Sequence, residues 1–130
     1  EQSSAFTHHG HAFSQGIDGQ NGTRNTPSIQ NLAFQNTFMY DGATEHLNLL
    51  PIIPITSAIE MNGNFTNAIN MMKNDATYQR LYKLAFADGQ INSENMLKAL
   101  GQFMVMATSS HSRFDKYRRN ESGGDLSTDE

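Results

Sequence analysis

The sequence of 130 residues contains no cysteine. The chain by itself therefore cannot form a disulfide, a thiolate zinc site or the thioether bonds that attach a haem through a CxxCH motif. It also has little positive charge, since nine lysines and arginines stand against thirteen aspartates and glutamates and the net charge is −4. A nucleic-acid-binding domain needs a basic face, so this balance argues against a nucleic-acid partner.

Long apolar runs are missing as well. None approaches the roughly 20 residues that a membrane-spanning helix requires. The longest apolar stretch, residues 49–55, contains Pro51 and Pro54 and is predicted not to form a helix interior. No signal peptide is recognisable and the chain begins with Glu1 instead of Met, as expected for a processed or truncated product. The length suits a single domain or a fragment of one.

The chain divides into two halves of different character. Residues 1–62 show little helical periodicity and contain all three prolines and several glycines, which favour turns. We expect a loop-rich half with one short helix near residues 28–35, just after Pro27. The apolar side chains of this half need a packing partner, and the alternatives are a large flat cofactor or the second half of the chain.

Residues 63–130 are predicted to be the helical half. Apolar residues recur there with helical spacing, and good capping residues precede them. Asn64 and Asp75 are expected to cap two consecutive helices, and Ser93 is expected to cap the longest one. The pattern predicts at least three helices over residues 63–118 and no sheet.

Histidines form the densest group of possible metal ligands. His8, His9 and His11 lie in one glycine-containing loop, and a His-x-His pair can bind a transition metal. The alternative is a polar loop whose histidines face water. His46 and His111 are isolated, and we interpret them as surface or capping residues.

Glu60 is the candidate for acid–base chemistry. It follows the proline-containing apolar stretch, where a carboxylate could be desolvated and suited to proton transfer. The alternative is a solvent-exposed or capping acid ahead of the helix at Asn64. The residues alone leave both interpretations open.

Several short segments, spread over almost the whole chain, occur in an order typical of one protein family. They are Ser14-Gln-Gly-Ile-Asp-Gly, Thr23-Arg-Asn-Thr-Pro-Ser-Ile-Gln-Asn, Phe38-Met-Tyr-Asp-Gly, His46-Leu-Asn-Leu-Leu-Pro-Ile-Ile-Pro-Ile-Thr, Glu60-Met, Ala99-Leu-Gly-Gln-Phe, Ser112-Arg-Phe-Asp-Lys-Tyr and Leu126-Ser-Thr-Asp-Glu. Their order and spacing together resemble the first haem domain of bacterial di-haem cytochrome c peroxidases and their methylamine-utilisation relatives.

The resemblance implies a mostly α-helical fold with long irregular loops, similar to a segment of a cytochrome c-like haem domain. Residues 1–62 would wrap the cofactor. In that family one CxxCH motif stands just before a segment like the one at Glu1, and a second follows a segment like Leu126 to Glu130. The chain thus resembles the piece between two haem-attachment motifs. The implied cofactors are haem c, whose motif this chain lacks, and a calcium ion between the two haems.

The resemblance also implies roles for single residues. Glu60 matches the distal acid that helps to cleave the O–O bond of peroxide, and Asn25 matches a residue near the calcium ion. Tyr40, Leu50 and Pro54 match positions at the cofactor, although the family usually has tryptophan in place of Tyr40 and glutamine in place of Leu50. Tyrosine can still relay electrons between the haems, whereas leucine cannot form a hydrogen bond.

The activity implied for the parent protein is that of a peroxidase, an oxidoreductase that reduces hydrogen peroxide with electrons from a small redox protein. The resemblance places the parent in the periplasm or outside the cell and allows a homodimer. The isolated chain is expected to be inactive. The alternative is a haem-free or inactive helical module for binding or assembly, derived from this family. We further predict that Asn25 occupies an ordered turn facing the loop of Tyr40.

Overall fold

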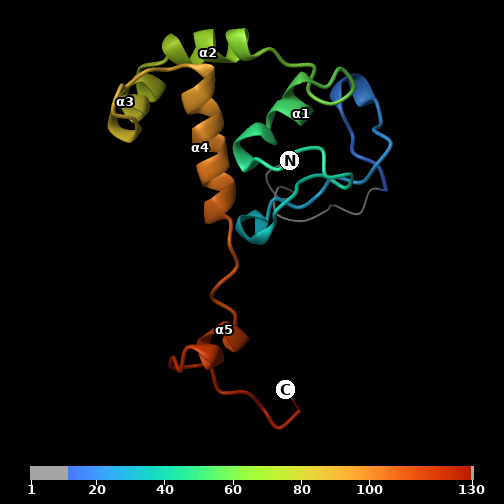
Figure 1. Cartoon of the computed structure of the whole chain (residues 1–130), viewed down its shortest axis with the longest axis vertical. Coiled ribbons are helices and arrows are strands. Elements are labelled where there is room, and N and C mark those ends of the chain that lie inside the picture. The colour runs from blue at the N-terminus through green and yellow to red at the C-terminus, as the bar shows by residue number, and fades with distance from the viewer. Residues whose placement is uncertain (1–11, 130) are drawn as a thin grey trace.

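The computed structural model describes residues 12–129 (Figure 1). Within this range the chain forms α-helices, single turns of 3₁₀ helix and two isolated antiparallel bridges, but no β-strand. The predicted fold class, mostly α with long irregular loops, is therefore confirmed. None of the helices in this range is long and apolar enough to cross a membrane.

The first half of the described chain consists mainly of turns. Its helical elements are the 3₁₀ helices η2 (Ile17–Gly19), η3 (Leu32–Phe34) and η4 (Leu47–Leu49) and the α-helix α1 (Ile52–Thr56). The helix expected near residues 28–35 is wrong in extent, because only the single turn η3 forms there. Asn31 precedes this turn in the left-handed conformation with φ 63°, and Gln35 after it is extended, so the helix cannot continue on either side.

α1 forms within the proline-containing stretch that was predicted not to form a helix interior, and that expectation is also wrong. Pro51 stands at the N-cap and Pro54 is the third residue of the helix. The first four backbone N–H groups of a helix have no acceptor within it, so a proline in the first turn loses no hydrogen bond. Both prolines are therefore compatible with a helix of five residues.

The predicted helical half begins with α2 (Phe65–Lys73) and α3 (Ala76–Ala85), which pack against each other. The Asn64 side chain accepts hydrogen bonds from the second and third backbone N–H groups of α2, at 2.8 and 3.3 Å. Asp75 caps α3 in the same way, at 2.7 and 3.3 Å. Both predicted caps are confirmed.

α4 (Ser93–Met106) is the longest helix, but its cap is Asn92 and not the predicted Ser93. The Asn92 side chain accepts a hydrogen bond from the backbone N–H of Asn95 at 2.8 Å. The side chain of Asn95 is buried and donates to Asp88 Oδ1 at 3.0 Å, so no polar group is left without a partner there. These contacts fix the start of the helix one residue earlier than its sequence suggests.

The core lies where α4 meets η3 and η4. Its buried members are Leu32, Phe38, Leu50 and Met104. Gly101 of α4 is buried at the contact with η4, and a β-carbon there would overlap the side chain of Asn48. Glycine at position 101 therefore allows η4 to approach α4 closely. The apolar residues of η3 and η4, which belong to the loop-rich first half, thus pack against the second half of the chain.

α5 (Arg113–Arg118) stands apart from the other helices, at the end of the irregular segment 107–112 that leaves α4 (Figure 1). It is stabilised locally by a capping box. The Ser112 side chain accepts from the backbone N–H of Asp115, and the Asp115 side chain accepts from the backbone N–H of Ser112. The Ser112 hydroxyl also donates to Asp115 Oδ2 at 2.6 Å, and this hydrogen bond, together with the one from the Ser112 N–H, holds the pKa of Asp115 below its ordinary value.

Much apolar surface is exposed on this fold. No side chain in the described range is fully buried, and Phe34, Met71, Leu84 and Met106 are each at least 74% exposed. In the part of the chain that the structure describes, the fold is therefore open, with apolar area available for further partners.

Candidate functional site

Glu60 lies in the turn that follows α1, and its backbone is held from two directions. Its N–H donates to the carbonyl of Ser57 at 3.2 Å, and its carbonyl accepts from the N–H of Ile17 at 2.7 Å. The residue as a whole is half-buried. The backbone of the candidate acid is thus fixed, and the residue as a whole remains partly accessible to solvent.

Apolar residues accompany this carboxylate. Ile59 and Met61 flank Glu60 in the sequence and Ile17 is its backbone partner; they are 42%, 59% and 38% exposed. We call these four residues the Glu60 patch. An acid whose neighbours along the chain and across the backbone contact are exposed and apolar is in a position to meet an apolar ligand, and a carboxylate within reach of a ligand can transfer protons.

The segment that contacts Glu60 is a hairpin of residues 14–24, here called the 14–24 hairpin. The N–H of Ser14 donates to the carbonyl of Arg24 at 2.9 Å, and the N–H of Gly16 donates to the carbonyl of Gln20 at 2.8 Å. An isolated antiparallel bridge lies between these two bonds. The hairpin therefore closes on itself through backbone hydrogen bonds.

Gly16 brings the 14–24 hairpin against the Glu60 turn. A β-carbon at Gly16 would lie 2.8 Å from the Cα of Glu60 and would overlap the carbonyl oxygen of Ile59. Only glycine lets the two backbones approach this closely without a shift. From the sequence, Gly16 was only one of several glycines expected to favour turns, and nothing predicted its close contact with Glu60.

Tyr40 is exposed at the tip of a second tight loop, residues 38–44. The N–H of Phe38 donates to the carbonyl of Thr44 at 2.8 Å across the base of this loop. Met39 has φ 68° and Gly42 has φ 69°, and these left-handed residues produce the reversal. We call this segment the Tyr40 loop.

An ion pair joins the Tyr40 loop to the 14–24 hairpin. Arg24 Nη1 donates to Asp41 Oδ2 at 2.7 Å, and this hydrogen bond holds the pKa of Asp41 below its ordinary value. Asn25 is half-buried and directly follows Arg24. This pair brings the residue next to Asn25 to the Tyr40 loop. The orientation of Asn25 toward that loop and a calcium ion at Asn25 stay predictions.

The two remaining site candidates, Leu50 and Pro54, lie in different surroundings. Leu50 is only 9% exposed and belongs to the core cluster. Pro54 is half-buried in α1, and its carbonyl accepts from the N–H of Met61 at 3.2 Å. Pro54 is thus attached to the Glu60 turn, while the side chain of Leu50 contributes to packing.

Metal-ligand clusters do not appear in the part of the chain that the structure describes: residues 12–129 contain no group of three or more His, Asp or Glu side chains placed to hold an ion. The predicted cluster of His8, His9 and His11 lies outside the described residues.

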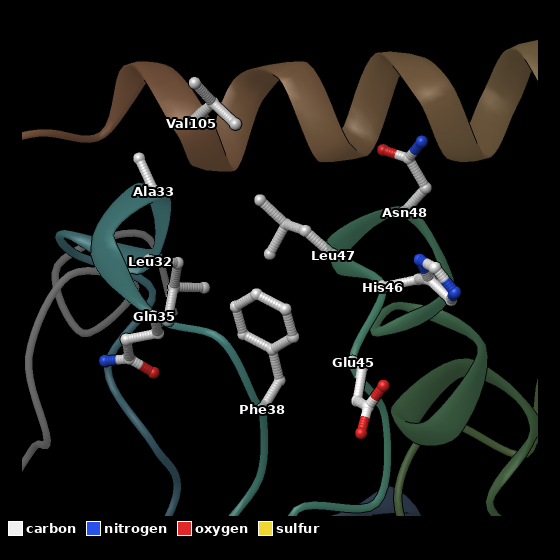
Figure 2. Close-up of a pocket in the computed structure, with 9 residues that line it drawn as sticks. All are labelled: Leu32, Ala33, Gln35, Phe38, Glu45, His46, Leu47, Asn48 and Val105. Atoms are coloured by element: carbon white, nitrogen blue, oxygen red, sulfur yellow. The ribbon is translucent and has the colours of Figure 1, made fainter.

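A separate pocket of about 350 Å³ lies beside the core, between η3, η4 and the end of α4. Figure 2 shows Leu32, Phe38 and Leu47 converging beneath α4, with Glu45 and His46 supplying polar groups at the edge. None of the Glu60 patch lines this pocket. His46 is exposed, as predicted, but no sequence pattern pointed to its place at a pocket.

Comparison with protein families decides the identity of this arrangement. Residues 1–123 match the family model of the di-haem cytochrome c peroxidases. The chain belongs to this family. It is 30% identical over 94 residues to the methylamine utilization protein MauG of Methylophilus methylotrophus, and 30% identical over 95 residues to the protein of the same name from Methylorubrum extorquens. Each alignment covers 72% of this chain.

The chain spans only 28% and 27% of the length of these two relatives. Among solved structures it is similar to the crystal structure of a MauG-like protein associated with microbial copper homeostasis. The TM-score is 0.76 at 25% identity, over 92% of this chain and 36% of that one. The resemblance drawn from the ordered segments is confirmed, together with the cytochrome c-like helical fold.

Membership of a di-haem family raises the question of whether these residues suit a haem. The Glu60 patch presents an acid beside exposed apolar side chains, and Tyr40 is 62% exposed in a loop tied to the same hairpin. This combination fits contact with a flat, largely apolar group. The chain has no cysteine, so it can contribute contacts to the haem but not the covalent attachment.

Proposed function

We propose that the chain is the part of a di-haem peroxidase that lies between the two haem-attachment motifs. In the parent it would supply the acid–base residue of the site where hydrogen peroxide is reduced to water. The observation that carries the proposal is Glu60 itself, a half-buried acid with a fixed backbone and exposed apolar neighbours. Family membership over residues 1–123 supports it.

The proposed reaction converts hydrogen peroxide, two electrons and two protons into two molecules of water. A bound haem would supply the iron-centred redox chemistry. The Glu60 carboxylate would take a proton from one peroxide oxygen and return it to the oxygen that leaves. The apolar members of the Glu60 patch would limit the access of bulk water to this proton transfer.

Other residues would serve the same site. Tyr40 would relay electrons between the haems, and Asn25 would bind a calcium ion there through an oxygen atom, the ligand type that calcium prefers. Pro54 would contact the cofactor next to the Glu60 turn. Leu50 would act by packing beneath the site, since its side chain lies in the core.

The partners are proposed from the same resemblance. Electrons would come from a small redox protein, one at a time, and the parent would work in the periplasm or outside the cell. A homodimer is compatible with the large apolar area that the open fold leaves exposed. The competing account is a haem-free helical module that keeps the fold for binding or assembly.

Replacement of Glu60 in the haem-loaded parent tests the proposal. Glu60→Gln keeps the size and the hydrogen-bonding capacity of the side chain but cannot shuttle a proton. Peroxide turnover should fall by about a hundredfold to ten-thousandfold, the usual contribution of an acid–base group. The Soret absorption should stay unchanged, because attachment of the haem does not involve Glu60.

Glu94→Gln is the matched control, because Glu94 is an exposed acid of α4 in an ion pair with Lys98. It should leave turnover unchanged. Turnover that is indifferent to Glu60→Gln would rule out the catalytic role. A parent that shows neither Soret absorption nor turnover would favour the haem-free module instead.

A further inference from the structure

We infer that the 14–24 hairpin couples the acid of this site to the Tyr40 loop, with Gly16 and Arg24 as positioning residues. The inference rests on the proposed function, in which Glu60 moves protons and Tyr40 relays electrons. The hairpin touches the Glu60 turn through Gly16 and touches the Tyr40 loop through Arg24. One element thus contacts both.

The contact with the acid is stiff because it joins backbone to backbone. Ile17 donates its N–H to the carbonyl of Glu60 at 2.7 Å, and the absent β-carbon of Gly16 leaves room for the Ile59–Glu60 peptide. No flexible side chain lies between the hairpin and the turn at this point. A displacement of the hairpin must therefore move the backbone of Glu60.

The contact between the hairpin and the Tyr40 loop is a single ion pair. The conformation of this loop is fixed by hydrogen bonds of its own backbone. The hydrogen bond from Phe38 to Thr44 closes the base of the loop, and Gly42 donates to the carbonyl of Met39 at 3.3 Å within the tip. Asp41 directly follows Tyr40, so its pairing with Arg24 orients the tip as a unit. Both partners are about half exposed, which makes the pair modest in strength and easy to perturb.

The hairpin can transmit a shift because its own backbone is cross-linked. Ser14 forms two backbone hydrogen bonds, at 2.9 Å to the carbonyl of Arg24 and at 2.8 Å from the N–H of Gly22. A third bond, from Gly16 to Gln20, closes the other end. Loosening of the contact with the Glu60 turn should therefore also loosen the ion pair with Asp41, and the reverse. The hairpin would thus position Glu60 and the Tyr40 loop together.

Amide hydrogen exchange of the haem-loaded parent measures this coupling without reference to activity. Two reporters are informative: the amide of Ile17, which is bonded to Glu60, and the amide of Phe38, which closes the Tyr40 loop. Arg24→Gln should lower the protection of Phe38 and also that of Ile17, each by up to about fivefold, the range expected for loss of an exposed ion pair. Gly16→Ala should lower the protection of both amides as well.

Two matched variants separate coupling from general destabilisation. Gly19→Ala strains the tip of the same hairpin, where φ is 71°, but a β-carbon there meets no neighbour within 4 Å. Lys98→Gln breaks another ion pair between exposed side chains, inside α4. Neither should affect the amide of Phe38. A variant at Gly16 or Arg24 that affects only its own end of the hairpin would overturn the inference.

Rescue and double substitution test the positioning roles in function. The charge exchange Arg24→Asp with Asp41→Arg should restore the protection that Arg24→Gln loses, and failure of this rescue would count against the ion pair. Gly16→Ala should lower peroxide turnover in the native background but add no further loss to Glu60→Gln. Equal losses in both backgrounds would show that Gly16 does not act through Glu60.

These outcomes are distinguishable from failure of the proposed function. If Glu60→Gln leaves turnover intact, the catalytic proposal fails and the positioning of a catalytic acid fails with it. The exchange measurements would still decide whether the hairpin links the two loops physically.

Discussion

Replacement of Leu50 by glutamine, the residue usual at this position in the family, should destabilise the fold. Leu50 is 9% exposed and packs with Leu32, Phe38 and Met104. Loss of nearly complete burial of a leucine side chain costs about 2 kcal/mol. The glutamine amide would also enter a cluster of apolar side chains, which adds about 1 kcal/mol for a polar group without a partner.

We therefore expect Leu50→Gln to lower the free energy of unfolding by about 3 kcal/mol. Urea unfolding followed by circular dichroism measures this change. Leu50→Met is the control, because it conserves volume and apolar character and should cost less than about 1.5 kcal/mol. Equal stability of Leu50→Gln and Leu50→Met would refute the argument. It would mean that the amide finds a partner, and that position 50 can still present a polar group to the site.

Three further outcomes follow from single contacts. Asn64→Ala removes the cap of α2 and should lower the free energy of unfolding by about 1 kcal/mol in the same urea assay; no change would mean that water replaces the cap. Tyr82→Ala should lower the free energy of unfolding by about 3 kcal/mol, because it leaves a cavity where the buried ring of α3 packs. Tyr82→Phe should lower it by less than about 1 kcal/mol, because the tyrosine hydroxyl makes only a weak 3.7 Å contact with Met72 Sδ. The pKa of Asp41 is lowered by its hydrogen bond from Arg24, so this ion pair contributes above the ordinary value of 3.8 and is lost as the pH falls through the lowered pKa. The exchange protection of Phe38 should accordingly decrease only in acid, and Asp41→Asn should remove that dependence.

The sequence was most informative where structure depends on neighbours in the chain. Asn64 and Asp75 cap the helices they were expected to cap, because an N-cap is decided within three residues. Asn92 replaces Ser93 as the cap of α4, and local preference could not separate two adjacent good caps. Contacts of the Asn95 side chain with the preceding loop favour the earlier one.

The candidate site could be predicted only in part, because its geometry depends on contacts between distant segments. Glu60 stood out through its apolar surroundings and the family resemblance. Nothing in the pattern revealed that Gly16 lies against it or that Arg24 pairs with Asp41, since each contact joins separate loops. The resemblance suggested a site role for Leu50, whereas its burial depends on how η4 packs on α4.

The way the Glu60 turn is attached has a consequence for the order of folding. α1 has five residues, far fewer than an isolated helix needs to persist in water. The turn after α1 is bonded to the 14–24 hairpin through Glu60 and Ile17, which lie far apart in the chain. Closing this long loop costs entropy before any contact forms. The capped pair α2 and α3 needs only local contacts and can form early. Glu60 should therefore reach its native setting late in folding, and partial unfolding should release the acid from the hairpin while most of the helical signal persists.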